Sequence, residues 1–144
     1  MTDYKRPLPV MTDLSKVFYD GCKKNKLLFQ KCKDCGEIIF FPKLICTNCM
    51  GRELEWQESS GKGKIFSFTV TYDAAPPEFM PYVPFVLAVV TLEEGFNILT
   101  NIEDCEFEAI CCDMPVVVKF DPVTPEVTLP KFVPADETMP KITA

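Results

Sequence analysis

The sequence predicts a mainly β fold that begins with a short helix and a cysteine-rich module. Four of its eight cysteines form two matched pairs, Cys32-x2-Cys35 and Cys46-x2-Cys49, which is the pattern of a metal-binding ribbon. From Lys64 onward, five segments rich in β-branched and aromatic residues alternate with turns. A helical pattern precedes the cysteines, so the expected order is helix, ribbon and then a small closed barrel.

Residues 1–26 are predicted to form an extended arm and a helix. Pro7 and Pro9 lie in a stretch without periodicity, and Thr12 or Asp13 is a plausible helix N-cap. An apolar stripe then follows one side of the helix, and it consists of Leu14, Val17, Phe18 and Cys22. Two interpretations stay open: the helix packs on its own domain, or it docks a partner through Phe18 and Tyr19.

Residues 27–60 are predicted to form the ribbon, with short strands at 27–31 and 37–41 around the first cysteine pair. Two residues between paired cysteines let both sulfur atoms face one point, and a following glycine supplies the positive backbone dihedral of such a turn. Cys32, Cys35, Cys46 and Cys49 would then place four thiolates in a tetrahedron around a structural zinc ion. The same four thiolates could hold a single iron for redox work, and the sequence does not separate these metals.

Residues 61–134 are predicted to form a five-stranded barrel of the oligonucleotide/oligosaccharide-binding (OB) type, followed by a tail at 135–144. The expected strands cover 65–72, 84–92, 96–101, 116–120 and 127–132. Phe66, Phe68 and Val70 are expected on one face of the first strand. The second strand is nearly continuous in Val, Leu and Phe, which predicts burial on both faces.

The long loop at residues 73–84 interrupts the barrel pattern. Four prolines stiffen it, and Phe79, Met80 and Tyr82 give it apolar character. A hairpin does not need twelve residues to reverse its direction, and long loops of this kind are often functional. The loop is therefore expected to contact a partner or ligand, or to cover the open edge of the barrel itself.

Composition narrows the classes of function. The chain contains no histidine, which removes the commonest general base and the imidazole-based zinc and nucleophile sites. Residues 1–64 carry 12 Lys and Arg against 8 Asp and Glu, whereas residues 65–144 carry 3 against 13. An acidic barrel would repel phosphates, so nucleic-acid binding is the weaker alternative. No apolar run is long enough to span a bilayer, and cysteines without an export signal indicate the reducing cytoplasm.

The sequence resembles the DUF35 family of OB-fold, acyl-CoA-associated proteins, which carry a rubredoxin-like zinc ribbon ahead of the barrel. The likeness covers roughly residues 12–134 and rests on Phe18-Tyr19, LFQKCKDCG at 28–36, Phe41-Pro42, CTNC at 46–49, GKGKIFSFT at 61–69, PFVLAVV at 84–90, LEEG at 92–95 and MPVVV at 114–118. Asp113 stands where the family usually has glycine, and Asp tolerates the left-handed backbone that such a turn needs. Cys111 and Cys112 also depart from the pattern. Adjacent cysteines are poor chelators and Cys105 is the only nearby addition, so Cys111 and Cys112 are expected to be small buried side chains rather than a second metal site.

The resemblance implies a non-catalytic subunit of an enzyme that acts on coenzyme A thioesters. Family members accompany thiolases, hydratases or aldolases, and this chain is similar to those that stand alone beside a thiolase. The implied partner is a thiolase-like catalytic subunit in a hetero-oligomer, with acyl-CoA bound where the two meet. The residues expected to contact the partner or acyl-CoA are Phe18, Tyr19, Lys24, Lys26, Phe79, Met80 and Tyr82.

Overall fold

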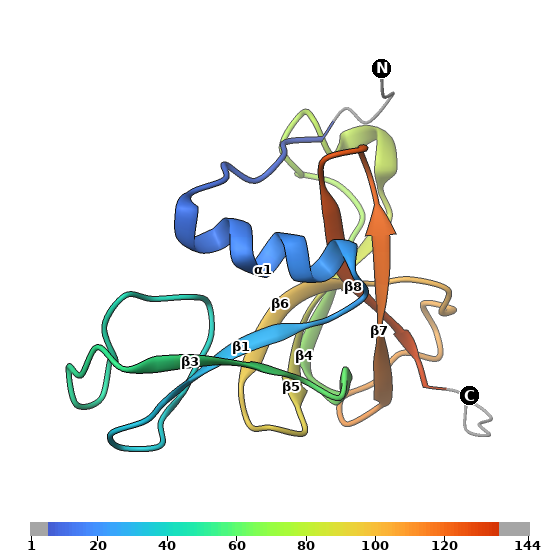
Figure 1. Cartoon of the computed structure of the whole chain (residues 1–144). Helices are drawn as coiled ribbons and strands as arrows, with labels where there is room; N and C mark the ends of the chain where they lie inside the picture. Colours follow the sequence, from blue (N-terminus) through green and yellow to red (C-terminus); the bar gives the residue numbers. More distant parts are fainter. Residues whose placement is uncertain (1–5, 136–144) are drawn as a thin grey trace.

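The computed structural model describes residues 6–135 and has the expected mainly β architecture (Figure 1). The elements, in chain order, are α1 (Asp13–Lys23), β1 (Leu28–Cys32), β2 (Ile38–Ile39), β3 (Leu54–Glu58), β4 (Lys62–Thr71), a 3-10 turn (Met80–Tyr82), β5 (Phe85–Leu92), β6 (Asn97–Ile102), β7 (Pro115–Pro122) and β8 (Thr128–Pro134). The ribbon projects to one side of the barrel, and α1 lies above the ribbon strands and passes in front of the barrel (Figure 1). Within residues 6–135, no helix has the length and apolarity to cross a membrane.

Thr12 is the N-cap of helix α1 and is one of the two residues that the sequence predicts for this position. The Ser15 amide donates to Thr12 Oγ1 at 3.0 Å, and the Thr12 amide donates to Ser15 Oγ at 2.9 Å. This reciprocal capping box satisfies two backbone donors that the first turn leaves without helical partners. Phe18 and Cys22 are buried, whereas Val17 is 40% exposed although the apolar stripe places it on the inner side.

The ribbon is a three-stranded antiparallel sheet in the order β2-β1-β3. Gln30, in the central strand, is buried and uses its side-chain amide as a clamp. Its Nε2 donates to the Lys43 carbonyl at 3.0 Å, and its Oε1 accepts from the Lys43 amide at 2.7 Å. Because both polar atoms are satisfied, this buried amide fixes the loop that leads into the second cysteine pair.

The barrel is closed, with strand order β4-β5-β6-β8-β7. Strands β6 and β8 run parallel, Ile102 opposite Phe132, and the other neighbours are antiparallel. This five-stranded arrangement confirms the predicted OB barrel. Its interior is filled by fully buried side chains that include Ile65, Val86, Val90, Val116 and Phe132.

Two expectations about the barrel strands are wrong. Burial alternates along β5, and Leu87 is 39% exposed, because one face of this strand points away from the barrel interior. In β4, the register shifts between Ile65 and Ser67, which marks a β-bulge. The bulge leaves Phe66 65% exposed, while Phe68 and Val70 still pack against the core.

One hydrophobic core joins the helix, the ribbon and the barrel. Phe18 of α1 meets Phe40 of the ribbon with ring centroids 5.4 Å apart, and Phe40 stacks on Phe96 of the barrel at 4.9 Å. Phe29 of β1 contacts the same Phe96 ring at 5.1 Å. The three parts are therefore held in fixed relation by side-chain packing as well as by their chain connections.

Candidate functional site

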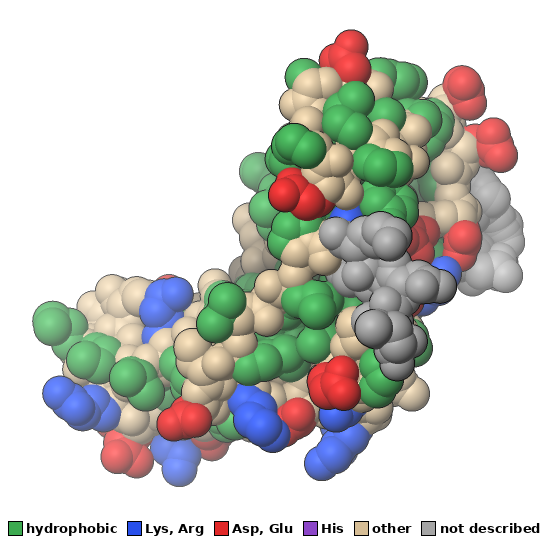
Figure 2. Space-filling view, turned by 90° about the horizontal axis from the view of Figure 1, so that it is seen from above, with side chains coloured by type: hydrophobic (Ala, Val, Ile, Leu, Met, Phe, Trp, Pro, Cys, Tyr) green, Lys and Arg blue, Asp and Glu red, His purple; other side chains and the backbone are tan. Residues whose placement is uncertain are grey.

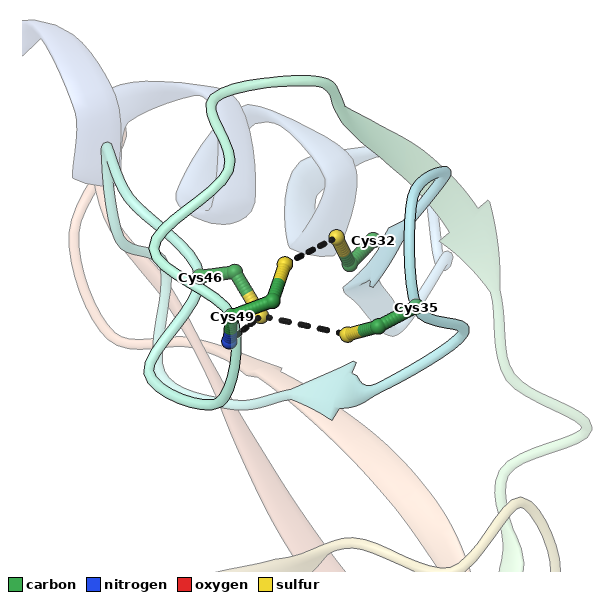
Figure 3. A group of neighbouring side chains, drawn as sticks. All are labelled: Cys32, Cys35, Cys46 and Cys49. Atoms are coloured by element: carbon green, nitrogen blue, oxygen red, sulfur yellow. Dashed lines mark hydrogen bonds between the residues drawn. The ribbon is translucent and has the colours of Figure 1, made fainter.

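The four cysteines of the two pairs lie together at the ribbon (Figure 3). Their sulfur atoms all lie within 4.8 Å of one another, with Cys32 and Cys49 at 3.6 Å and Cys35 and Cys46 at 3.6 Å. Each close contact joins one cysteine of the first pair to one of the second. Figure 3 shows the sulfur atoms of both loops turned toward a common centre.

Backbone and side-chain donors surround these sulfur atoms. The amides of Asn48 and Cys49 donate to Cys46 Sγ at 3.3 and 3.5 Å. The Gly51 amide donates to Cys49 Sγ at 3.4 Å, and Asn48 Nδ2 reaches across to Cys35 Sγ at 3.4 Å. Donors aimed at sulfur stabilise its thiolate form and orient it toward a metal.

The two turns differ in the residue that takes the left-handed backbone. After the first pair, Gly36 has φ of 82°, as predicted. After the second pair, Met50 has φ of 64°, so the expectation that the glycine there takes the positive dihedral is wrong. Gly51 is needed for space instead, because a Cβ there would come within 2.5 Å of Asp34 Oδ2 and 3.2 Å of Cys49 Sγ.

The chemistry of the four thiols fits a bound dication. Hydrogen bonds from Asn48 and the Glu37 backbone lower the pKa of Cys35 to about 7. The Gly51 amide also lowers the pKa of Cys49, but the neighbouring thiols of Cys32 and Cys35 outweigh it and raise that pKa to about 12. The first thiolate thus forms easily, whereas four together need a positive charge between them. Four sulfur ligands leave no open coordination position, which is the character of a structural site.

The predicted contact residues on the helix have different surroundings. Phe18 is 2% exposed, so it cannot present its ring to a partner and instead supports its neighbours from inside. Tyr19 is half-buried, and desolvation, together with the charge of Cys22, raises its pKa. Its ring lies 6.2 Å from that of Phe41. Lys24 and Lys26 are exposed just beyond the helix.

The loop at residues 73–84 lies beside the N-terminal arm, away from the ribbon (Figure 1). Phe79 is half-buried, and its ring lies 6.1 Å from that of Phe85. Met80 and Tyr82 are 39% and 37% exposed. The Arg6 guanidinium stands over the Tyr82 ring at 4.3 Å, a cation–π contact that joins the arm to the loop.

Cys111 and Cys112 are not the small buried side chains that the sequence suggested. Cys111 and Cys112 are exposed and Cys105 is half-buried, because they lie in the surface segment between β6 and β7. Asp113, which follows them, has φ of 70°, and its amide donates to the Ile65 carbonyl at 2.7 Å. The expectation that Asp113 takes the left-handed turn conformation is confirmed.

A groove of about 480 Å³ separates the aromatic side chains of the helix and ribbon from the barrel strands β6 and β8. Its lining residues include Tyr19, Phe41, Asn97, Leu99, Asn101 and Lys131. Lys131 is 4% exposed, and its Nζ lies 2.6 Å from Asp121 Oδ2 and 3.1 Å from Glu103 Oε2. The sequence does not predict this buried ion pair, because the residues of a strand do not indicate which distant segments will cover their side chains.

A second, larger groove of about 730 Å³ runs along β4, the end of β5 and the start of β7. Lys62, Lys64, Glu93 and Asp113 give its lining mixed charge. It lies away from the ribbon and the predicted contact residues. Figure 2 shows Lys and Arg interspersed with Asp and Glu along the helix and ribbon part, while hydrophobic and uncharged side chains cover much of the barrel part, with Asp and Glu at its margin.

Two family models match adjoining parts of the chain. The model described as "ChsH2, rubredoxin-like zinc ribbon domain" matches residues 20–55, and "ChsH2, C-terminal OB-fold domain" matches residues 56–121. The residues matched by the zinc ribbon model include all four clustered cysteines, and this match supports zinc as the metal of the site.

Three curated relatives show where the chain belongs. A DUF35 domain-containing scaffold protein of Methanothermobacter thermautotrophicus is 33% identical over 102 residues, covering 70% of this chain and 76% of that protein. The benzoylsuccinyl-CoA thiolase subunit BbsA of Geobacter metallireducens is 31% identical over 93 residues, covering 65% and 60%. A probable enoyl-CoA hydratase alpha subunit of Thermomonospora curvata is 31% identical over 130 residues, or 90% of this chain, but the match spans just 40% of that relative.

A solved structure shares the whole architecture. A chain of the Ltp2–ChsH2(DUF35) aldolase superposes with a TM-score of 0.79 at 29% identity, covering 88% of this chain and 98% of that chain. The fold is therefore shared over most of this chain. By its sequence relatives and its zinc ribbon followed by an OB barrel, this chain belongs to the DUF35 family.

Proposed function

We propose that this chain is a non-catalytic subunit of a thiolase-type complex that acts on acyl-CoA thioesters. The observation that carries the subunit role is the likeness to a chain of the Ltp2–ChsH2(DUF35) aldolase over 88% of this chain. The relative BbsA, a benzoylsuccinyl-CoA thiolase subunit, supports the thiolase assignment and makes benzoylsuccinyl-CoA a candidate substrate for the complex.

The interior of the chain fits a supporting role. The ribbon, α1 and barrel share one core through Phe18, Phe40 and Phe96, so the chain forms a rigid body whose zinc site is closed. Rigid parts position a partner's active site better than mobile ones. The partner would then supply the nucleophile and the general base, which the histidine-free sequence does not offer in their usual form.

The surface offers places where acyl-CoA would meet the subunit. Exposed Lys24 and Lys26 suit the phosphates of coenzyme A, because an ammonium group interacts with phosphate as a point charge. Met80 and Tyr82 on the proline-stiffened loop suit an apolar cover for the acyl group. Eight free cysteines suit a reducing compartment such as the cytoplasm.

A second candidate is a partner subunit of an acyl-CoA aldolase or hydratase. The aldolase chain that superposes on this one favours it, as does the hydratase alpha subunit of Thermomonospora curvata. The structural requirement is the same, a docked subunit beside an acyl-CoA site. The two candidates differ in the reaction that the catalytic partner performs.

Reconstitution tests the proposal. The chain is co-expressed with each of three catalytic subunits, a thiolase, an aldolase and a hydratase of the type that DUF35 proteins accompany. We expect a stable complex with the thiolase, and thiolysis of a β-ketoacyl-CoA that the chain alone does not perform. Enzyme-like thiolysis by the chain alone, or no complex with any of the three, would overturn the proposal.

A further inference from the structure

The outer surface of strands β4, β5 and β6 forms a continuous face that is uncharged except at one end, where exposed Lys64 lies opposite Thr91. Along each strand, successive side chains point alternately into and out of the barrel, and residues paired across two strands point to the same side. The outward positions therefore follow from the pairing. We call this surface the barrel face, and its ten residues are Ser67, Thr69, Thr71, Phe85, Leu87, Val89, Thr91, Asn97, Leu99 and Asn101. A quarter of the chain is charged, yet none of these ten residues carries charge, and the uncharged area ends at Lys64, which pairs with Thr91.

Large apolar side chains are exposed at the centre of the barrel face. Leu99 is 67% exposed and Leu87 is 39% exposed, and Val89 pairs with Leu99 across β5 and β6. Two asparagines are already engaged: Asn97 Oδ1 accepts from Thr91 Oγ1 at 2.6 Å, and Asn101 Nδ2 donates to the Val86 carbonyl at 2.8 Å. With these exposed leucines and no charge among its ten residues, the face resembles the uncharged centre of a protein interface.

The barrel face is continuous with the groove beside the helix and ribbon. Asn97, Leu99 and Asn101 belong to both surfaces, and Tyr19 and Phe41 form the far wall of the groove. A partner that lies on the barrel face would thus also reach the aromatic side chains of the ribbon. Because the barrel is closed, β4, β5 and β6 each have a neighbour on both sides, so the partner must cover a face rather than add a strand.

Carboxylates stand at both ends of the barrel face. Glu93 and Glu94 occupy the β5–β6 turn, Asp73 follows β4, and Glu103 and Asp104 follow β6. Lys64 lines the same groove as Glu93, and Lys119 pairs with Glu103 and Asp104, so the rim is mixed. Residues 65–144 carry 3 Lys and Arg against 13 Asp and Glu, so a second copy of this chain would bring an acidic barrel against an acidic barrel, and a nucleic acid would bring phosphates. The charge pattern instead fits a protein surface that is apolar at its centre and carries Lys or Arg around it.

We infer that the barrel face is the docking surface for the catalytic subunit, and that this subunit presents an apolar patch rimmed by basic side chains. The inference rests on the proposed function for the identity of the partner. It adds which side of the chain is covered and what chemistry covers it. Leu99 lies at the centre of the contact, with the groove beside it receiving partner side chains between Leu99 and Phe41.

A matched pair of leucine variants tests the inference. Leu99→Glu places a carboxylate at the centre of the barrel face, and Leu44→Glu makes the same change on the ribbon, where Leu44 is 75% exposed. Binding to the catalytic subunit with which the wild-type chain forms a complex is measured by calorimetry at about 0.15 M salt. We expect Leu99→Glu to weaken binding at least about tenfold and Leu44→Glu by less than about twofold, because an unpaired carboxylate is costly to bury.

Each outcome separates this inference from the proposed function. If Leu99→Glu binds with wild-type affinity and Leu44→Glu loses binding, then the barrel face is not the docking surface, and the proposed subunit role still stands. A second variant, Thr69→Lys, changes an exposed position of β4. If this variant binds the catalytic subunit as tightly as the wild-type chain does, the result would likewise count against the inference. If sedimentation shows that the wild-type chain forms a dimer and that Leu99→Glu is a monomer, then the barrel face binds a second copy of this chain. If the wild-type chain binds no catalytic subunit, the proposed function itself fails.

Discussion

The ring of Phe40 in the ribbon stacks on the ring of Phe96 in the barrel, with centroids 4.9 Å apart and planes inclined by 24°. Phe40 follows β2 directly, and Phe96 lies at the start of the return from the β5–β6 turn. Phe18 and Phe29 contact this pair from the helix and from β1. The stack fixes the angle between the metal module and the barrel.

Phe96→Ala is expected to destabilise the chain by about 3–5 kcal/mol, because it leaves a cavity where three structural parts meet. Phe66→Ala removes the same ring from a position that is 65% exposed and is expected to cost less than about 0.5 kcal/mol. Urea unfolding followed through the single Trp56 measures both. Equal effects of the two substitutions would contradict the packing account.

Cys35→Ser is expected to remove the bound zinc, whereas Cys111→Ser is expected to leave about one zinc ion per chain. Both cysteines are exposed, but Cys35 belongs to the clustered four and Cys111 does not. Metal content after dialysis, measured by atomic absorption, checks this. Full zinc content in Cys35→Ser would contradict the assignment, and an iron–thiolate absorption band in the wild type would replace zinc with iron.

Gly36→Ala and Met50→Gly are expected to change stability in opposite directions. Both positions have positive φ, at 82° and 64°, and a Cβ at Gly36 meets nothing within 4 Å, so the backbone alone decides. Alanine at Gly36 is expected to cost about 1 kcal/mol, and glycine at Met50 to stabilise by about 0.5–1 kcal/mol. Thermal unfolding of the zinc-loaded variants measures both, and two changes of the same sign would contradict this reading of the turns.

Lys131→Met is expected to destabilise the chain by about 1–3 kcal/mol, because it leaves Asp121 and Glu103 beside an apolar side chain. Lys119→Met is the control, since Lys119 contacts Glu103 and Asp104 at longer distances and its side chain is 44% exposed. Its loss is expected to cost less than about 0.5 kcal/mol. Chemical unfolding near neutral pH checks the pair, and equal costs would show that burial adds nothing to the Lys131 ion pair.

Local patterns in the sequence predicted the parts of the structure that depend on neighbouring residues. The spacing of the cysteines located the metal group, Thr12 located the helix start, and Gly36 located the left-handed turn of the first pair. The strand segments were found because β-branched and aromatic residues cluster between turn residues. The family resemblance supplied the order of the modules and the expectation that Asp113 adopts positive φ.

Contacts between distant segments escaped prediction for physical reasons. A strand of Val, Leu and Phe reads as buried on both faces, and only barrel closure decides that Leu87 points outward. The bulge that turns Phe66 to solvent depends on pairing with β5. The Phe40–Phe96 stack and the buried Lys131 likewise join residues far apart in the chain, so no local periodicity reports them.

Reconstitution of thiolysis tests the central account most directly. The chain, the thiolase catalytic subunit and their mixture are each assayed with a β-ketoacyl-CoA and free coenzyme A. The account predicts full thiolysis in the mixture, none by the chain alone, and a drop in the mixture's activity at limiting subunit concentration when Leu99→Glu replaces the wild-type chain. The account would be contradicted if the chain alone performed thiolysis. It would also be contradicted if the catalytic subunit did not bind the chain and had the same activity with and without it.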